Sequence, residues 1–258
     1  MNDIWVIAQG DSEIGLAAAL RFARAGARPV LCLTQALSAA AKEALKGCPY
    51  EIASVDWQDE QSVRAAAREA DGLFYNRRPP VVKESLLTMP LECVDQLIDR
   101  DMIGAFLAVK CFGEAMGKKK RGSVALLGSI HDDKPIGASA TLSLYAGALR
   151  NMCFEAALYY GEKNVRCNLI EAGPLAGEGE RLTGGASRFY DGYRYKIPSG
   201  AAGTAEDMAN LACFLLSDQS AYINGAPLRM DGGLVHEYID ALTNARAIRR
   251  MTEAKNER

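Results

Sequence analysis

Two hydroxyl-bearing residues, Ser129 and Tyr145, flank a polar loop and are the side chains best suited to chemistry in this sequence. Ser129 follows the apolar run Val124 to Leu127, and Tyr145 opens a helix-like segment. A serine hydroxyl and a phenol held at one carbonyl can orient its oxygen and exchange a proton with it. The phenol, with an ordinary pKa of about 10, needs a nearby cation to do this at neutral pH. The position one helical turn later is Leu149, which has no charge.

Other charged residues near this pair are weak replacements. Arg150 is one residue too far along and points about 100° away around a helix. Lys134 lies in the loop, where the sequence does not fix its position. His131, followed by Asp132 and Asp133, is more typical of a turn than of a metal site, because zinc generally takes three or four protein ligands. We therefore predict no metal.

The elements that position these residues alternate between short apolar strands and helices. Strands are expected at 4–8, 29–33, 51–55, 72–75, 124–127, 165–171 and 227–230, and helices at 12–25, 36–46, 60–70, 94–116, 145–161 and 205–216. Such alternation favours a sheet covered by helices on both faces. The sequence predicts an α/β fold over residues 1–258, a single Rossmann-type doubly wound domain with a mainly parallel seven-stranded sheet.

The composition excludes several classes of protein. A net charge of −2 gives no reason to expect nucleic acid, and no run reaches the roughly 18 apolar residues that span a bilayer. The N-terminus resembles no signal peptide. Seven cysteines, mostly inside apolar segments and without a C-x-x-C pair, suggest buried thiols in a reducing compartment. We expect a cytoplasmic protein.

Two C-terminal motifs resemble the short-chain dehydrogenase/reductase family. FLLSDQSAYINGAPLRMDGG (Phe214 to Gly233) is similar to the closing motif of that family, and NVRCNLIEAGP (Asn164 to Pro174) to its sixth strand and following turn. The resemblance covers nearly the whole chain. It implies an oxidoreductase scaffold that binds NAD or NADP, with Asp56 against the adenine. Thr34 and Gln35, after the second strand, do not choose between the two cofactors.

The nucleotide loop departs from the family pattern. The residues expected to bind cofactor there are Gly10, Ser12 and Gly15, but the loop is one residue short, and the middle glycine of the family pattern is either replaced by Glu13 or missing. Asp11 and Glu13 can cap the first helix, and they would repel a dianion.

The family's N-N-A-G strand end departs as well. Asn76 is kept, but Arg77 and Arg78 replace small residues. Either arginine could reach Glu13 and plug the site, or both could be solvated or bind a phosphate.

The catalytic set implied by the resemblance is also incomplete. Ser129 and Tyr145 match the serine and tyrosine. Asp101 stands where the family has an asparagine, and Leu149 where it has a lysine.

Two further segments have uncertain roles. Residues 173–203 correspond to the family's substrate lid, where Tyr and Arg side chains would grip an anionic or acyl-thioester substrate or dock on a partner subunit. Residues 239–258 are expected to form a charged helical tail.

These observations leave two hypotheses. The first is a non-catalytic subunit, without tightly bound cofactor, that pairs with an active paralogue in a hetero-oligomer, expected to be a heterotetramer, through helices 94–116 and 145–161. The second is an active NAD(P)-dependent oxidoreductase with an atypical Ser129, Tyr145 and Asp101 site. The differences from the family pattern lie at the positions that bind cofactor or transfer protons, and the core keeps the family pattern. This distribution favours the first hypothesis, a non-catalytic subunit.

Overall fold

A parallel sheet of seven strands forms the centre of the molecule, with the order β3-β2-β1-β4-β5-β6-β7. The computed structural model describes residues 3–80, 85–135, 139–176 and 197–236. Every strand pair is parallel, so the predicted Rossmann-type doubly wound fold is confirmed. The strands are β1 (Ile4–Ile7), β2 (Arg28–Cys32), β3 (Glu51–Ala53), β4 (Gly72–Tyr75), β5 (Gly122–Ser129), β6 (Val165–Ala172) and β7 (Pro227–Met230).

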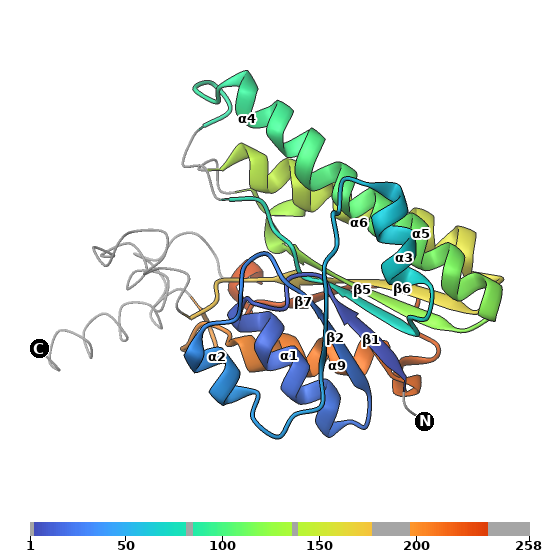
Figure 1. Cartoon of the computed structure of the whole chain (residues 1–258). Coiled ribbons are helices and arrows are strands. Elements are labelled where there is room, and N and C mark those ends of the chain that lie inside the picture. The colour runs from blue at the N-terminus through green and yellow to red at the C-terminus, as the bar shows by residue number, and fades with distance from the viewer. Residues whose placement is uncertain (1–2, 81–84, 136–138, 177–196, 237–258) are drawn as a thin grey trace, which may run out of the picture.

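Helices cover both faces of this sheet (Figure 1). The first face carries α1 (Glu13–Arg24), α2 (Ala39–Ala44) and α9 (Ala205–Leu216), which enclose one apolar core. The second face carries α3 (Glu60–Ala67), α5 (Ile103–Lys119) and α6 (Ala140–Gly161), which enclose the other. The short α4 (Leu91–Gln96) leads into α5 through a π-helical segment, Leu97–Met102. Both cores are continuous with the middle of the sheet, which explains why β4 is buried along its whole length.

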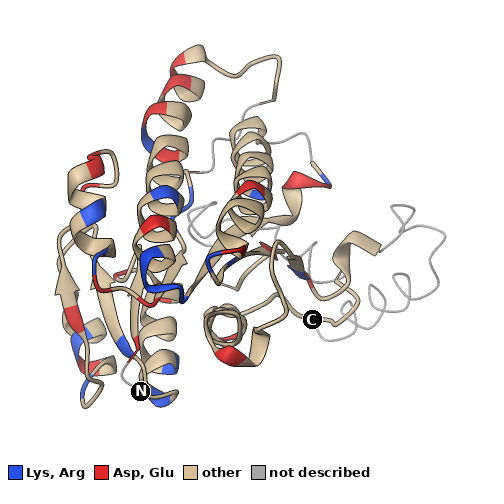
Figure 2. Cartoon of the chain, turned by 90° about the vertical axis from the view of Figure 1, so that its right-hand side faces the viewer, with Lys and Arg blue, Asp and Glu red and all other residues tan. Residues whose placement is uncertain are grey.

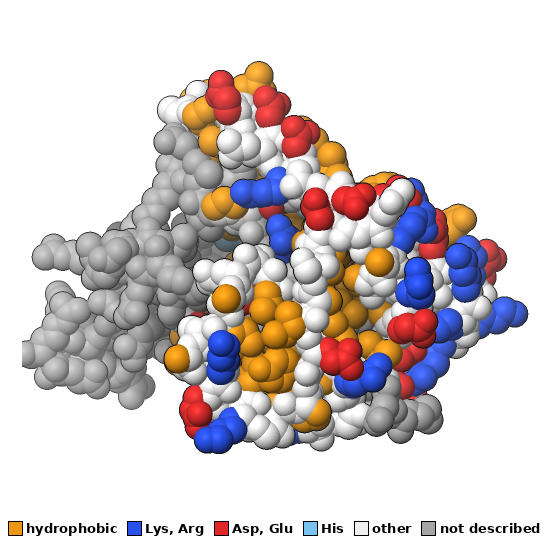
Figure 3. Space-filling model, viewed as in Figure 1, with side chains coloured by type: hydrophobic (Ala, Val, Ile, Leu, Met, Phe, Trp, Pro, Cys, Tyr) orange, Lys and Arg blue, Asp and Glu red, His pale blue; other side chains and the backbone are white. Residues whose placement is uncertain are grey.

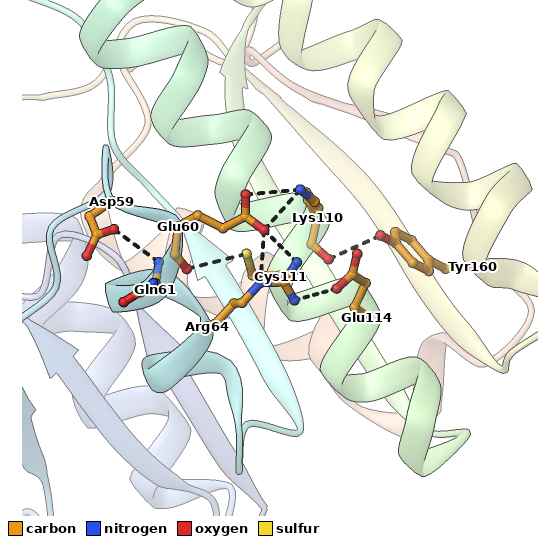
Figure 4. Close-up of polar contacts among 8 residues, drawn as sticks. All are labelled: Asp59, Glu60, Gln61, Arg64, Lys110, Cys111, Glu114 and Tyr160. Carbon is orange, nitrogen blue, oxygen red and sulfur yellow. Dashed lines mark hydrogen bonds and ion pairs between the residues drawn. The ribbon is translucent and has the colours of Figure 1, made fainter.

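Polar contacts join the three helices of the second face (Figure 4). Glu60 on α3 accepts hydrogen bonds from Arg64 and from Lys110 of α5, and Arg64 also pairs with Glu114 of α5. The Tyr160 hydroxyl of α6 donates to the Lys110 carbonyl at 3.1 Å. The network fixes α5 and α6 against each other, and these elements carry the residues around Tyr145.

Five of the six predicted helices have different bounds in the structure. The helices predicted at 12–25, 36–46 and 60–70 are present as α1, α2 and α3 but are shorter. Helix α6 begins at Ala140, more than a turn before Tyr145, so Tyr145 does not open the helix as expected. The predicted helix 94–116 is instead α4, the π-helical segment and α5, and it extends from Leu91 to Lys119. Most of the predicted lid and the whole predicted tail lie outside the described residues.

The charges along the helices are mixed in sign (Figure 2). None of the described helices is long and apolar enough to cross a membrane. Within the described ranges, no three His, Cys, Asp or Glu side chains are arranged to hold a metal ion.

Candidate active site

Tyr145 is almost completely buried. Its side chain is 1% exposed, and its hydroxyl donates a hydrogen bond to the Arg77 carbonyl at 3.1 Å. Burial, with Tyr75 and Asp101 nearby, raises the pKa of Tyr145 well above its ordinary value, and Arg77 opposes this rise only in part. A phenol that exchanges protons near neutral pH needs the opposite shift. This phenol is protonated at every physiological pH.

Leu149 lies one turn further along α6, on the same helix face as Tyr145. It is 0% exposed and belongs to the same apolar core. The position that a lysine occupies in the family pattern is therefore a packing position here. Arg150 does not replace that cation, because its guanidinium lies 3.5 Å from Asp132 and 3.7 Å from Glu171.

Asp101 is held by its neighbour in the π-helical segment. The Arg100 guanidinium binds it in two-point fashion, with Nη2 to Oδ2 at 2.8 Å and Nε to Oδ1 at 3.1 Å. Asp101 is buried and near enough to Tyr145 to act on the pKa of its phenol. The structure thus brings together Tyr145, Asp101, Tyr75 and Arg77. Tyr75 is a residue that the motif comparison missed, and its only signal was a bulky side chain directly before Asn76.

Ser129, at the end of β5, contacts a different residue. Its Oγ lies 2.7 Å from Nδ1 of His131, in the 3₁₀ turn Ile130–Asp132. The turn predicted around His131 is confirmed. The hydroxyl that the sequence assigns to a carbonyl oxygen is engaged by an imidazole within its own turn.

The glycines kept in the nucleotide loop are required for packing. A Cβ on Gly10 would lie 2.6 Å from Leu31 Cβ, and one on Gly15 would lie 2.1 Å from the Gln9 carbonyl oxygen. Both contacts are shorter than van der Waals distance, so α1 can sit this close to β1 and β2 only with glycine at these positions. The middle glycine of the family pattern, which lets a backbone approach a pyrophosphate, has no counterpart in this shorter loop, where Glu13 follows Ser12.

Protein groups also satisfy the polar atoms of this loop. The Ser12 hydroxyl caps α1 by accepting from Gly15 N at 3.0 Å. Asn76 accepts from Gln9 N at 2.8 Å and donates to the Gln9 carbonyl and to Ser12 Oγ. The expectation that Asp11 caps α1 is wrong, because its carboxylate accepts from the backbone N and the hydroxyl of Thr34. Asp11 thereby links the loop to the end of β2.

Arg77 lies among the carboxyl ends of β2, β4 and the start of α6. Burial raises the pKa of Cys32 to about 12 and raises the pKa values of Tyr75 and Tyr145 as well, and the positive charge of Arg77 opposes each rise only in part. Its Nε is buried without a hydrogen-bond partner. The predicted pairing of Arg77 or Arg78 with Glu13 stays a prediction. Asp56 lies beyond the end of β3, exposed, where it accepts a hydrogen bond from Gln58 N at 2.9 Å.

Comparison with known proteins identifies the scaffold. A family model described as enoyl-(acyl carrier protein) reductase matches residues 8–235. The chain is 30% identical to 2-(S)-hydroxypropyl-CoM dehydrogenase 3 of Xanthobacter autotrophicus, over 90% of this chain and 96% of that protein. The chain belongs to the short-chain dehydrogenase/reductase family.

A second relative is similar in sequence, and a solved structure is similar in fold. The inactive 2-(S)-hydroxypropyl-CoM dehydrogenase 2 of Xanthobacter autotrophicus is also 30% identical, over 58% of this chain and 67% of that one. A short-chain dehydrogenase/reductase from Serratia marcescens superimposes with a TM-score of 0.77 at 23% identity, covering 91% of this chain and 98% of that structure. The family therefore includes a protein named as inactive whose sequence is similar to this one.

Proposed function

We propose that this short-chain dehydrogenase/reductase is the non-catalytic subunit of a dehydrogenase that acts on a hydroxyacyl substrate. One observation carries the proposal: the Tyr145 phenol is buried and donates to a backbone carbonyl, with Leu149 in the place of the cation that would activate it. Such a phenol forfeits much of the roughly 10²–10⁴-fold contribution of a well-matched proton donor. The scaffold is retained because it is needed for assembly.

The nucleotide loop supports the same conclusion. Its glycines are needed for helix packing. The Ser12 hydroxyl binds the Gly15 amide, and the Asn76 side chain binds the Gln9 carbonyl. The positive charge of Arg77 lies near the strand ends along which a dinucleotide would bind. The residues present do not fit NAD or NADP well. We infer that neither is bound tightly, and we derive no step through either one.

The partner surface is proposed from the outer sides of α5 and α6. Large apolar side chains are exposed there: Ile103 (40%), Phe106 (54%), Leu144 (48%), Leu158 (78%) and Tyr159 (63%). Exposed apolar groups of this size gathered on neighbouring helices mark interaction sites. Figure 3 shows further hydrophobic side chains, interspersed with acidic ones, along the end of this layer that α4 forms. An active paralogue with equivalent helices would cover them, in a heterotetramer.

The substrate class follows from a resemblance and not from the site. The chain resembles the silent subunit of the two-subunit alcohol dehydrogenase of anaerobic toluene breakdown, which acts on a benzylsuccinyl-CoA derivative. On that basis we propose a CoA-thioester substrate and a role in aromatic hydrocarbon degradation in the cytoplasm.

Titration of the purified chain with NADH and NADPH, followed by fluorescence, tests the proposal. We expect no saturation up to millimolar nucleotide and no turnover of hydroxyacyl thioesters, and tight association with an intact paralogue when the two are co-expressed. Micromolar saturation together with turnover by this chain alone would overturn it.

The second hypothesis, an active enzyme, has one observation in its favour. The positive charge of Arg77 opposes the rise in the pKa of Tyr145 that burial causes, and the missing lysine would act in the same direction. If that charge activates the phenol, an Arg77→Met variant loses turnover of the isolated chain while retaining its fold. If the chain is silent, the variant changes no activity.

A further inference from the structure

Five charged side chains gather behind Ser129, outside the group around Tyr145. Asp132 and Asp133 lie at the end of β5, Arg150 on α6, Glu171 on β6 and Arg229 on β7. The Arg229 guanidinium binds Glu171 through Nε at 3.2 Å and Asp133 through Nη2 at 3.0 Å. Four separate elements therefore meet at one ionic cluster.

Two carboxyl groups of this cluster are buried and short of donors. The side chain of Asp132 is 0% exposed and that of Glu171 is 2% exposed. Among the residues that the structure describes, no donor makes a hydrogen bond to either oxygen of Asp132 or to Oε1 of Glu171. Arg150 Nη1 lies 3.5 Å from Asp132 Oδ2 and 3.7 Å from Glu171 Oε1, too far for a hydrogen bond of normal length, and Arg229 binds the other oxygen of Glu171, Oε2. Two buried carboxylates left in this way would be costly.

One proton shared between the two carboxyl groups removes the cost of burying both as carboxylates. Asp132 Oδ2 and Glu171 Oε1 both lie within 4 Å of the same Arg150 nitrogen, so the two buried carboxyl groups are close neighbours. The described groups of the cluster are three carboxyls, Asp132, Asp133 and Glu171, and two guanidiniums, so one added proton makes the cluster neutral. Lys134, on the same turn, is exposed. Two neighbouring carboxyl groups cannot both lose their protons without a large cost in electrostatic repulsion.

We propose that Asp132 and Glu171 share one proton, and that this proton fastens the turn that holds His131 against Ser129 to strand β6. The amides of Asp133 and Lys134 both bond to the Ile130 carbonyl, within the turn itself, and the Arg229–Asp133 contact ties the turn to β7. Loss of the proton leaves two facing carboxylates, which push the turn away from β6. The cluster is thus a pH-sensitive latch on the Ser129–His131 turn.

The direction of the pH dependence follows from the geometry. Burial and the neighbouring Glu171 raise the pKa of Asp132 to about 6, while Arg150 opposes the rise. A carboxyl group whose pKa is raised by folding stabilises the folded chain below its unfolded value of about 4. That contribution is lost as pH rises through about 6. The latch is closed in mild acid and open above neutrality.

Two measurements on the full chain test the latch. In ¹³C-carboxyl NMR, wild type should show one carboxyl of the pair titrating near pH 6, a signal separate from the His131 ring. In hydrogen exchange, the protection factors of the Asp133 and Lys134 amides, corrected for intrinsic rates, should fall about tenfold or more between about pH 5 and pH 7.5.

Variants separate the shared proton from other causes. In Glu171→Gln the amide donates permanently to Asp132, so the titration near pH 6 and the loss of protection should both disappear. Asp132→Asn should do the same from the other side, and it serves if the first variant fails to fold. Asp133→Asn, in the same turn but outside the pair, should keep the titration. The latch is refuted if both carboxyls of wild type titrate below about pH 5, or if either amide variant keeps the transition.

Discussion

At the scale of single residues, the decisive feature is the environment of one phenol. Tyr145 and Leu149 lie on one face of α6 and are enclosed by the core between the helices and the sheet. An apolar neighbour desolvates the phenol, whereas an ammonium would stabilise the phenolate. The Tyr145 hydroxyl is satisfied by the Arg77 carbonyl, so it contributes to stability like any buried hydrogen bond.

Restoring the lysine of the family pattern at position 149 should lower the stability of the chain. Leu149→Lys places an ammonium in a fully buried position, and we expect it to lower the free energy of unfolding by roughly 2–5 kcal/mol. Leu149→Met keeps the volume and should cost less than about 1.5 kcal/mol. Urea denaturation measures both. A lysine variant that is as stable as wild type and turns over a hydroxyacyl substrate would contradict our view of this site.

Removing the phenol hydroxyl separates a structural role from a catalytic one. Tyr145→Phe deletes one hydrogen bond to a backbone carbonyl and should cost about 0.5–1.5 kcal/mol, since the carbonyl loses its donor. The assembled complex should keep its kcat. A hundredfold fall in kcat with unchanged stability would instead place Tyr145 among the reacting groups.

At the scale of elements, the start of α1 shows how a binding motif can become a packing motif. The helix approaches β1 so closely that the Gln9 carbonyl fills the space beside Gly15, and Asn76 fastens the loop to β4. These contacts require glycine whether or not a nucleotide is present. The remaining glycines are therefore weak evidence for a cofactor.

Alanine substitutions test this account of the loop. Gly15→Ala forces a methyl group against a backbone carbonyl at 2.1 Å and should destabilise by about 1–3 kcal/mol or more. Gly147→Ala, in α6 with nothing within 4 Å of the added Cβ, should stabilise by roughly 0.5–1 kcal/mol. Thermal unfolding without nucleotide compares the pair. Equal effects at both positions would rule out a packing role for Gly15.

The outer sides of α5 and α6 make a separate prediction about assembly. Phe106→Asp and Leu158→Asp change side chains that are 54% and 78% exposed, so the isolated chain should keep its stability within about 0.5 kcal/mol. Association with the paralogue should weaken at least about tenfold, because each charge is buried on binding. Ile52→Asp, 58% exposed on the edge strand β3, is the matched control. Size-exclusion chromatography with light scattering measures the result, and unaffected assembly in both variants would remove this surface from the proposal.

At the scale of the whole molecule, buried acids of high pKa set the alkaline limit of the fold. Burial raises the pKa of Tyr75 and Tyr145 above their ordinary value and that of Cys32 to about 12. The folded chain therefore holds protons that the unfolded chain releases at about pH 9 to 10. Stability from these groups is complete below that range and is lost as pH rises above it.

Alkaline denaturation should consequently be cooperative with tyrosine ionisation. We expect the free energy of unfolding to fall steadily above about pH 10, with the fall reduced in a Tyr75→Phe, Tyr145→Phe double variant. Circular dichroism and phenolate absorbance, followed together, check this. Phenolate absorbance that develops fully before the fold is lost would show that both phenols are solvated.

Several elements were predictable because their signals are local. Strands β4 and β7 and helix α9 have the predicted bounds: apolar runs define these strands, and Thr204 and Asp207 form a capping box that starts α9. Alternation of strands and helices predicted the parallel seven-stranded sheet, but not the order of its strands. The start of α6 was missed because no side chain caps it at Ser139, so the pattern could not show where the loop ends.

The sequence by itself determined the fold, the family resemblance and the absence of a cation one turn after Tyr145, because each depends on the order of residues along the chain. Only the tertiary structure decided that Asp11 binds Thr34, that Arg77 lies beside the phenol, and that Asp132 faces Glu171. Those pairs come from strands and turns far apart in sequence. Their meeting depends on strand order, register and burial, and a charge acquires a partner or a shifted pKa only once burial has removed water from around it.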